Sequence, residues 1–158
     1  MSATSSTTAE QEFDLIVLGA GPIGETLALA VAKQGLKPAI VEHDLVGGDC
    51  AYYACKPSKA LLRPIEVAAT TQHLRGVENS HVGADDLLTR RDEQVSNYDD
   101  SGQKESLESA GVTVVRGHGQ LNGERTVEVH GNDGTTQTLR TTRAVVVTTG
   151  TTPNIPPV

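Results

Sequence analysis

The chain contains no tryptophan, three tyrosines and one phenylalanine. This scarcity of aromatic residues argues against an aromatic-rich β-sandwich core, so the interior must come mainly from Val, Leu, Ile and Ala. Hydrophobic residues make up 37% of the sequence. That mixture favours an α/β layer structure, and 158 residues suit one domain with one sizeable core.

An excess of positive charge and a long apolar run are also missing. The formal net charge of −7 gives no general attraction to nucleic acid or to anionic lipid. No apolar stretch is long enough to span a membrane, and the Ser- and Thr-rich residues 1–12 lack the apolar region of a secretory signal. We expect residues 1–12 to be a disordered tail, and the protein to be cytoplasmic and to bind neither membrane nor nucleic acid.

Two cysteines, Cys50 and Cys55, are present. Structural disulfides are uncommon in the cytoplasm, so a redox or metal role is considered before a structural crosslink. Both residues are expected near a helix start, where the dipole lowers a thiol pKa, and Pro57 could bring the sulfurs within bonding distance. Inert buried thiols remain an alternative. A metal site is not predicted, because His43 is the nearest histidine and no second ligand pair has suitable spacing.

The first part of the chain predicts a βαβ unit. A β-branched apolar run at residues 13–18 indicates a buried parallel strand, apolar residues recur at helical spacing from Ile23 to Gln34, and a second strand over Pro38–Val41 ends at Glu42. Further helices are expected over 50–65, distorted or divided by Pro57 and Pro64, and over 85–110, with Gly102 as a candidate interruption. Strands are expected at 112–116, 126–130, 136–139 and 144–147, the middle two forming a hairpin across the Gly-Asn-Asp-Gly turn at 131–134.

A glycine pattern follows the first strand directly. Gly19 permits a tight turn, Gly21 lets the backbone approach a pyrophosphate, and Gly24 lets the helix pack closely on the strand. The helix that starts at Pro22 and Ile23 would direct its positive end to phosphate. Glu42 could accept hydrogen bonds from ribose hydroxyls and would repel a 2′-phosphate. The alternative is a tight strand–helix turn without a ligand.

The run from Gly47 to Leu62 reads Gly-Gly-Asp-Cys-Ala-Tyr-Tyr-Ala-Cys-Lys-Pro-Ser-Lys-Ala-Leu-Leu. It resembles the active-site signature G-G-x-C-x4-C-x-P-S-K of the class I pyridine nucleotide–disulfide oxidoreductases. The segments Gly117-His118-Gly119 and Thr148-Thr149-Gly150 resemble later motifs of that family. The resemblance implies a Rossmann-like FAD-binding domain over 13–150, with a central parallel sheet and a small antiparallel hairpin or meander, followed by a linker over 151–158.

The same resemblance implies roles for individual residues. Cys55 would lie beside the flavin, Cys50 would exchange with the substrate, and Lys59 would stabilise reduced flavin unless it is an ordinary solvated lysine. The residues implied to bind FAD are Gly19, Gly21, Pro22, Ile23, Gly24, Glu42, Gly48, Asp49, Lys59, His118, Gly119, Thr149 and Gly150.

Departures from the family pattern surround the cysteines. Tyr52 and Tyr53 replace an asparagine and a small apolar residue, Ala54 replaces a glycine and Asp49 a threonine. These changes leave the substrate open, whether a small disulfide or a metal ion. Thr148 in place of alanine is a small change. Retention of both cysteines argues against the family's transhydrogenase branch.

Family members are much longer, with an NAD(P)-binding domain and an interface domain that carries a His–Glu acid–base pair. We therefore expect a fragment that is inactive alone. The full-length enzyme would be a homodimer that uses FAD with NAD or NADP. The alternative is a non-catalytic dinucleotide-binding or thiol redox-sensing module.

Overall fold

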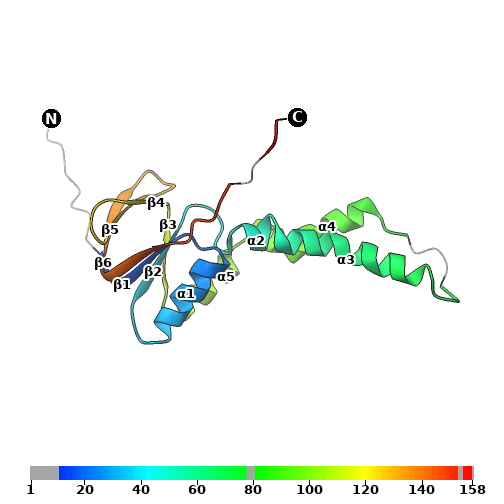
Figure 1. The fold of residues 1–158 in the computed structure, drawn as a ribbon, viewed down its shortest axis with the longest axis horizontal. Helices are drawn as coiled ribbons and strands as arrows, with labels where there is room; N and C mark the ends of the chain where they lie inside the picture. The colour runs from blue at the N-terminus through cyan, green and yellow to red at the C-terminus, as the bar shows by residue number, and fades with distance from the viewer. Residues whose placement is uncertain (1–10, 78–80, 153–154, 158) are drawn as a thin grey trace.

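The computed structural model describes residues 11–77, 81–152 and 155–157. Figure 1 shows a twisted sheet with helices against it and a pair of long helices projecting away from it. The elements are, in order, β1 (Gln11–Leu18), α1 (Pro22–Ala32), β2 (Pro38–Glu42), α2 (Gly48–Tyr52), α3 (Cys55–Thr71), α4 (Ala84–Gln94), the 3₁₀ turn η1 (Ser96–Tyr98), α5 (Ser101–Ser109), β3 (Thr113–Arg116), β4 (His118–Leu121), β5 (Thr126–His130) and β6 (Thr136–Val147).

The strands form one mixed sheet in the order β3-β2-β1-β6-β5-β4. The first four of these strands are parallel, while β5 pairs antiparallel with both β4 and β6. This confirms the expected α/β fold with a parallel centre and a small antiparallel meander. The strand β1 lies between β2 and β6, so the chain continues from β1 to one side of the sheet and later returns to its other side. The carboxyl end of β1 is therefore a topological switch point, the place where open α/β sheets bind ligands.

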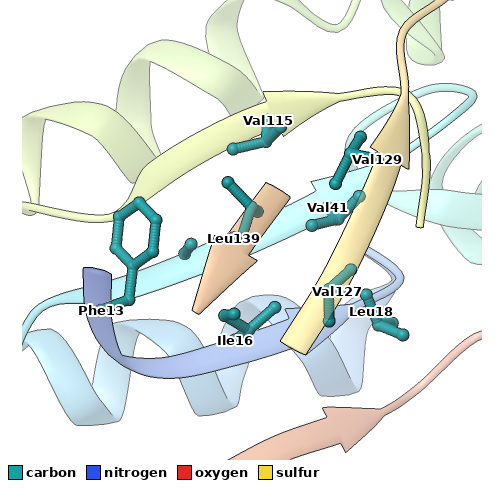
Figure 2. Packing of buried hydrophobic residues seen from close by; sticks show 9 residues of the cluster. Phe13, Ile16, Leu18, Val41, Val115, Val127, Val129 and Leu139 are labelled. Carbon is teal, nitrogen blue, oxygen red and sulfur yellow. The ribbon is translucent and has the colours of Figure 1, made fainter. Parts of the chain in front are cut away.

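Two apolar clusters hold the layers together, because successive residues of β1 face opposite sides of the sheet. Val17 packs with Ala28 of α1 and Leu107 of α5 on one face. On the other face, the meander supplies Val127, Val129 and Leu139, which point towards β1, β2 and β3 (Figure 2). The remaining labelled members of this second cluster are Phe13, Ile16, Leu18, Val41 and Val115.

The strand β6 is longer than the sequence pattern predicts. The two separate strands expected at 136–139 and 144–147 are one strand of 12 residues. Its first part forms the expected hairpin with β5, and β1 pairs along most of its length, which keeps the intervening residues extended. The end of β6 is not buried, although its last residues are apolar, since Val147 is 56% exposed.

The start of the chain corrects the expected tail. The strand β1 begins at Gln11, so Gln11 and Glu12 are paired with Leu139 and Arg140 of β6 instead of disordered. The hydrogen bonds that β6 offers decide this, because polar side chains do not prevent backbone pairing. The rest of the predicted tail, residues 1–10, lies outside the described residues, as do 153, 154 and 158 of the predicted linker.

The helical middle of the chain also differs from expectation. Gly102 lies within α5, and the interruption falls earlier, across Val95–Asp100, where η1 intervenes. The helix α3 runs through Pro64 without a break. No helix among the described residues is both long and apolar enough to cross a membrane.

Candidate active site

A cavity of about 310 Å³ lies at the carboxyl ends of the parallel strands. Its walls come from the segments that follow β1, β2, β3 and β6, which the sheet brings to one edge. The predicted cofactor residues that line it are Gly19, Gly21, Glu42, Gly48, Asp49, His118, Gly119, Thr149 and Gly150. Segments separated by more than a hundred residues in the sequence thus form one concave surface.

The glycine loop has the geometry that close packing requires. Gly19 has a φ of +100°, and a Cβ there would lie 2.6 Å from the carbonyl oxygen of Thr148. A Cβ on Gly24 would overlap the carbonyl oxygen of Gly19, so the first turn of α1 fits against β1 only without a side chain. At Gly21, the N-cap of α1, a Cβ would meet nothing within 4 Å, which leaves the backbone open to the cavity.

The carboxylate of Glu42 is buried and held by protein hydrogen bonds. Its Oε2 accepts from the backbone N–H of Ala20 at 2.7 Å. Its Oε1 accepts from the N–H of Asp44 at 2.9 Å and lies 3.1 Å from Nδ1 of His43. A carboxylate has about four acceptor positions, so these bonds orient Glu42 and leave acceptor capacity towards the cavity.

The far wall of the cavity is formed by the start of β4. The ring of His118 meets that of His43 edge to face, with centroids 5.9 Å apart. A Cβ on Gly119 would lie 2.8 Å from Leu18 and 3.1 Å from Val41. The two core side chains therefore require glycine at this position, and the strand can approach β1 and β2 there.

The two cysteines lie on separate helices. Cys50 is in α2 and Cys55 is the first residue of α3, with the chain turning at Tyr53 and Ala54. The division expected at Pro57 therefore falls before it. Pro57 lies in the first turn of α3, where the missing N–H has no helical partner to lose. Both thiols are free, and the turn lets their side chains meet.

The contact between the thiols controls the acidity of Cys50. A hydrogen bond with Cys55, together with partial desolvation and the charge of the Cys55 thiolate, raises the pKa of the Cys50 thiol, while the charge of Lys59 opposes this shift. The expectation that helix position lowers both thiol pKa values was therefore wrong for Cys50. The hydrogen bond with the Cys55 side chain is the largest cause of the shift.

The family model for pyridine nucleotide-disulphide oxidoreductases matches residues 13–158. The chain belongs to this family. Full-length pyridine nucleotide-disulphide oxidoreductases are enzymes that use FAD and NAD(P).

Individual relatives agree with this assignment. The chain is 35% identical over 155 residues to dihydrolipoyl dehydrogenase of Chlorobaculum parvum, a match that covers 96% of this chain and 33% of that protein. It is 33% identical over 140 residues to the soluble pyridine nucleotide transhydrogenase of Sodalis glossinidius, covering 85% of this chain and 30% of that protein. Mercuric reductase of Staphylococcus aureus is 28% identical over 149 residues, covering 92% of this chain and 26% of that protein.

A solved structure shows the same fold. It is the Cu(II) complex of the HOCl-induced flavoprotein disulfide reductase RclA from Escherichia coli, with a TM-score of 0.73 and 19% identity. The match covers 94% of this chain and 31% of that one. The chain thus spans about a third of the length of the relatives that it matches.

Four predicted cofactor residues of this family member lie outside the cavity. Gly24 is behind the loop, and Pro22 and Ile23 are exposed on the first turn of α1. Lys59 is exposed on α3, near enough to Cys50 for its charge to act on the thiol. The structure therefore brings the glycine loop, Glu42 and the Thr148-Thr149-Gly150 segment together around one cavity, whereas Lys59 lies outside it.

A polar network behind the cavity was not foreseen. Arg116 donates to the carboxylate of Asp100 at 2.6 Å and to the backbone carbonyl of Asp44. The same Asp100 carboxylate accepts the N–H of Val46 at 2.7 Å. This ion pair fixes the loop between β2 and α2 that leads to Cys50. No sequence signal joins Asp100 to a loop 54 residues earlier.

Thr148 is a second residue whose importance the sequence did not indicate. Its hydroxyl lies 2.8 Å from the carbonyl oxygen of Gly19 and 3.0 Å from that of Leu18, and its single proton is donated to this pair of acceptors. An alanine could not make these bonds. The threonine that stands in place of the family's alanine is therefore more than a small change, because it holds the end of β6 against the glycine loop.

The residues present fit the adenosine diphosphate half of FAD. The loop leaves backbone open at Gly21, the N-terminal end of α1 can receive phosphate, and a buried carboxylate follows β2. The cavity is at the small end of the range for ligand pockets, roughly 300–1,000 Å³. A whole dinucleotide would therefore extend beyond it.

Proposed function

We propose that this chain supplies the FAD-binding surface and the redox thiol pair of an NAD(P)-dependent disulfide oxidoreductase similar to dihydrolipoyl dehydrogenase. The observation that carries the proposal is the contact between the Cys50 and Cys55 side chains, on a segment that begins at the cavity wall with Gly48 and Asp49. Cys50 follows the cavity-lining residue Asp49 directly in the sequence. A dinucleotide bound in the cavity would therefore lie beside the pair of thiols.

We assign the cofactor contacts as follows. The pyrophosphate lies on Gly19–Gly24 and the first turn of α1, and the ribose of the adenosine lies on Glu42. His118 and Gly119 are assigned to adenine, and Thr149 and Gly150 to the continuing chain of the cofactor. Gly48 and Asp49 close the cavity on the side of the thiols, and Lys59 provides a cation near them.

Bound FAD would supply two-electron exchange between a nicotinamide and the thiol pair. The chain's own part is thiol–disulfide exchange. The Cys50 thiolate attacks one sulfur of a substrate R–S–S–R, forming a mixed disulfide and releasing RS⁻. Cys55 then attacks the Cys50 sulfur and releases the second RS⁻. The dithiol loses two electrons, the substrate gains them, and the two released thiolates take up the two thiol protons.

The whole protein's partners follow from the same proposal. Its substrate would be a small disulfide or a metal ion, its nicotinamide NAD or NADP, and its full-length form a homodimer in the cytoplasm. Glu42 favours FAD or NAD over a 2′-phosphorylated nucleotide at the first site, because its carboxylate would repel a phosphate.

Thiol counting tests the proposal directly. The reduced chain is titrated for thiols before and after mild oxidation, and the oxidised sample is digested to map the linkage. We expect two titratable thiols to disappear and a Cys50–Cys55 peptide to form. Cys50→Ser and Cys55→Ser are matched controls, each leaving one thiol that cannot close an internal bond. Retention of both thiols in the native chain would contradict the proposal.

Cofactor titration tests the other half. We expect FAD to bind weakly and NAD(P)H-dependent disulfide reduction to be absent for this chain alone, because the cavity fits only part of the dinucleotide. Robust turnover by the 158-residue chain would contradict its assignment as one part of a longer active site.

A further inference from the structure

All three tyrosines of the sequence gather at the turn between the two cysteines. Tyr52 is buried, whereas Tyr53 and Tyr98 are 52% and 39% exposed. The rings of Tyr53 and Tyr98 are stacked, with centroids 6.0 Å apart and 28° between their planes. Core packing does not account for this pair, since both rings present area to solvent.

Tyr98 is held in place by an unusual backbone. Ser96, Asn97 and Tyr98 have φ values of 55°, 52° and 62°, the left-handed region that residues other than glycine rarely adopt. The segment is anchored by Val95, which is 1% exposed, and by Asp100, which accepts the N–H of Val46. Such strain persists where the surrounding structure imposes it, so the position of Tyr98 is determined by its anchors.

The stack lies next to the redox pair along the chain. Tyr53 is two residues before Cys55, so their Cα atoms are at most about 7.6 Å apart. The Tyr53 hydroxyl donates to Oδ2 of Asp44 at 3.2 Å, which holds the ring at a fixed angle. A group attached to a disulfide under attack at Cys50 or Cys55 would be within reach of these rings.

Carboxylates outnumber cations around the tyrosines. Arg116 acts on Tyr52 and Arg91 interacts with Tyr98, but each of these arginines is ion-paired, with Asp100 and with Asp92. Desolvation is the largest cause that raises the pKa of the Tyr53 hydroxyl, and the carboxylates of Asp44 and Asp49 act in the same direction. Asp99 acts in the same direction on Tyr52. The cations Lys56 and Lys59 are on α3, after Cys55 in the chain, and the charge of Lys59 also acts on Cys50. Aromatic faces and carboxylates together attract cations and repel anions.

We propose that Tyr53 and Tyr98 are specificity-determining residues that select disulfides carrying a positively charged ammonium or guanidinium group close to the sulfur–sulfur bond. This inference rests on the proposed function, because it names the substrate class of the same thiol pair. The cation lies on the stacked rings while the Cys50 thiolate attacks, and the exchange then proceeds with the electron and proton balance given above.

Three small disulfides that differ in charge test the inference. The reduced chain is reacted with cystamine, which carries two ammonium groups, with neutral bis(2-hydroxyethyl) disulfide and with anionic dithiodipropionate. Each rate is divided by that of dithiothreitol with the same disulfide, which removes intrinsic reactivity. We expect a normalised preference of about tenfold for cystamine over the neutral compound, and the anionic compound to react slowest.

Matched variants separate the rings from the general charge. Tyr98→Leu and Tyr53→Leu should each reduce the cystamine preference by about threefold, in line with an exposed cation–π contact. Tyr98→Phe keeps the ring and should retain the preference. If one leucine variant folds poorly, the other carries the comparison, because each removes one ring of the stack without changing the net charge.

The outcomes distinguish this inference from the proposed function. If the wild-type thiols fail to react with the neutral disulfide and form no internal bond, the proposed function fails. If they react with all three disulfides without preference for the cation, only the specificity inference is overturned. It is also overturned if Tyr98→Leu weakens FAD binding while leaving the order of rates unchanged, since the rings then serve the cofactor.

Discussion

The backbone N–H of Ala20 donates a hydrogen bond of 2.7 Å to Oε2 of Glu42. One partner is in the glycine loop after β1 and the other is the last residue of β2, so the bond fixes the loop relative to the neighbouring strand. The carboxylate thereby contributes both to the shape of the cavity and to its charge.

Glu42→Gln should weaken adenosine binding without unfolding the chain. The glutamine oxygen can still accept from Ala20, whereas its NH2 group cannot accept from Asp44, and the negative charge that would hold the ribose hydroxyls is lost. We expect the Kd for ADP or FAD to rise about tenfold, the loss of one charge-assisted hydrogen bond. Titration calorimetry with ADP measures this. Glu124→Gln, with a side chain 84% exposed, is the control. An unchanged affinity for Glu42→Gln would refute the ribose assignment.

Gly24→Ala should destabilise the chain by about 1–3 kcal/mol, the usual effect of overpacking. The new methyl group would overlap the Gly19 carbonyl oxygen and lie 2.8 Å from the Thr148 hydroxyl. Gly102→Ala is a matched control in α5, where a Cβ meets nothing within 4 Å. That control should be stabilising by about 0.5–1 kcal/mol, because alanine favours helix. Urea denaturation measures both, and a neutral Gly24→Ala would show that α1 can move away from β1.

Removing Cys55 should make Cys50 more reactive. The hydrogen bond with Cys55 is the largest cause that raises the pKa of Cys50. A raised pKa leaves less thiolate at a given pH, so Cys55→Ala should lower the pKa and speed alkylation of Cys50. Lys59→Gln should act in the opposite direction, since the lysine charge favours the thiolate. The rate of iodoacetamide labelling between pH 7 and 10 gives both directions.

A Cys50 labelling profile that does not move in Cys55→Ala would mean that the two sulfurs do not interact in solution. Lys56→Gln is the control for a general loss of positive charge on α3, because Lys56 does not appear among the causes of the Cys50 shift.

Asp100→Ala should loosen the loop between β2 and α2. The substitution removes the acceptor of the Val46 N–H and the partner of Arg116. We expect faster hydrogen exchange at the Val46 amide and a loss of about 1–3 kcal/mol, as for an unpaired donor and a broken charge-assisted bond. Glu105→Ala, at an exposed position of α5, should change neither. Unchanged protection of Val46 would show that the loop is held by other contacts.

Local pattern was sufficient for much of the fold. The apolar run of β1, the glycine loop and the strand that ends at Glu42 were predicted because each depends on neighbours close in sequence. The hairpin between β5 and β6 was predicted for the same reason, since its turn residues are contiguous. The failures are at positions where a distant partner decides. Gln11 is in a strand because β6 pairs with it, and the helix break is at Val95–Asp100 because Val95 is buried and Asp100 is bonded to Val46.

The sequence by itself determined the chemistry that this chain can offer. It holds two thiols in a recognisable motif, a glycine loop after the first strand and an acid after the second strand. The tertiary structure decided how these groups act on one another. It placed the acid against Ala20, brought Thr148 to the glycine loop, let the Cys50 and Cys55 side chains meet so that the pKa of Cys50 rises, and stacked Tyr98 on Tyr53. Residue types are fixed by covalent structure, whereas acidity and packing depend on which atoms the folded chain brings within a few ångströms.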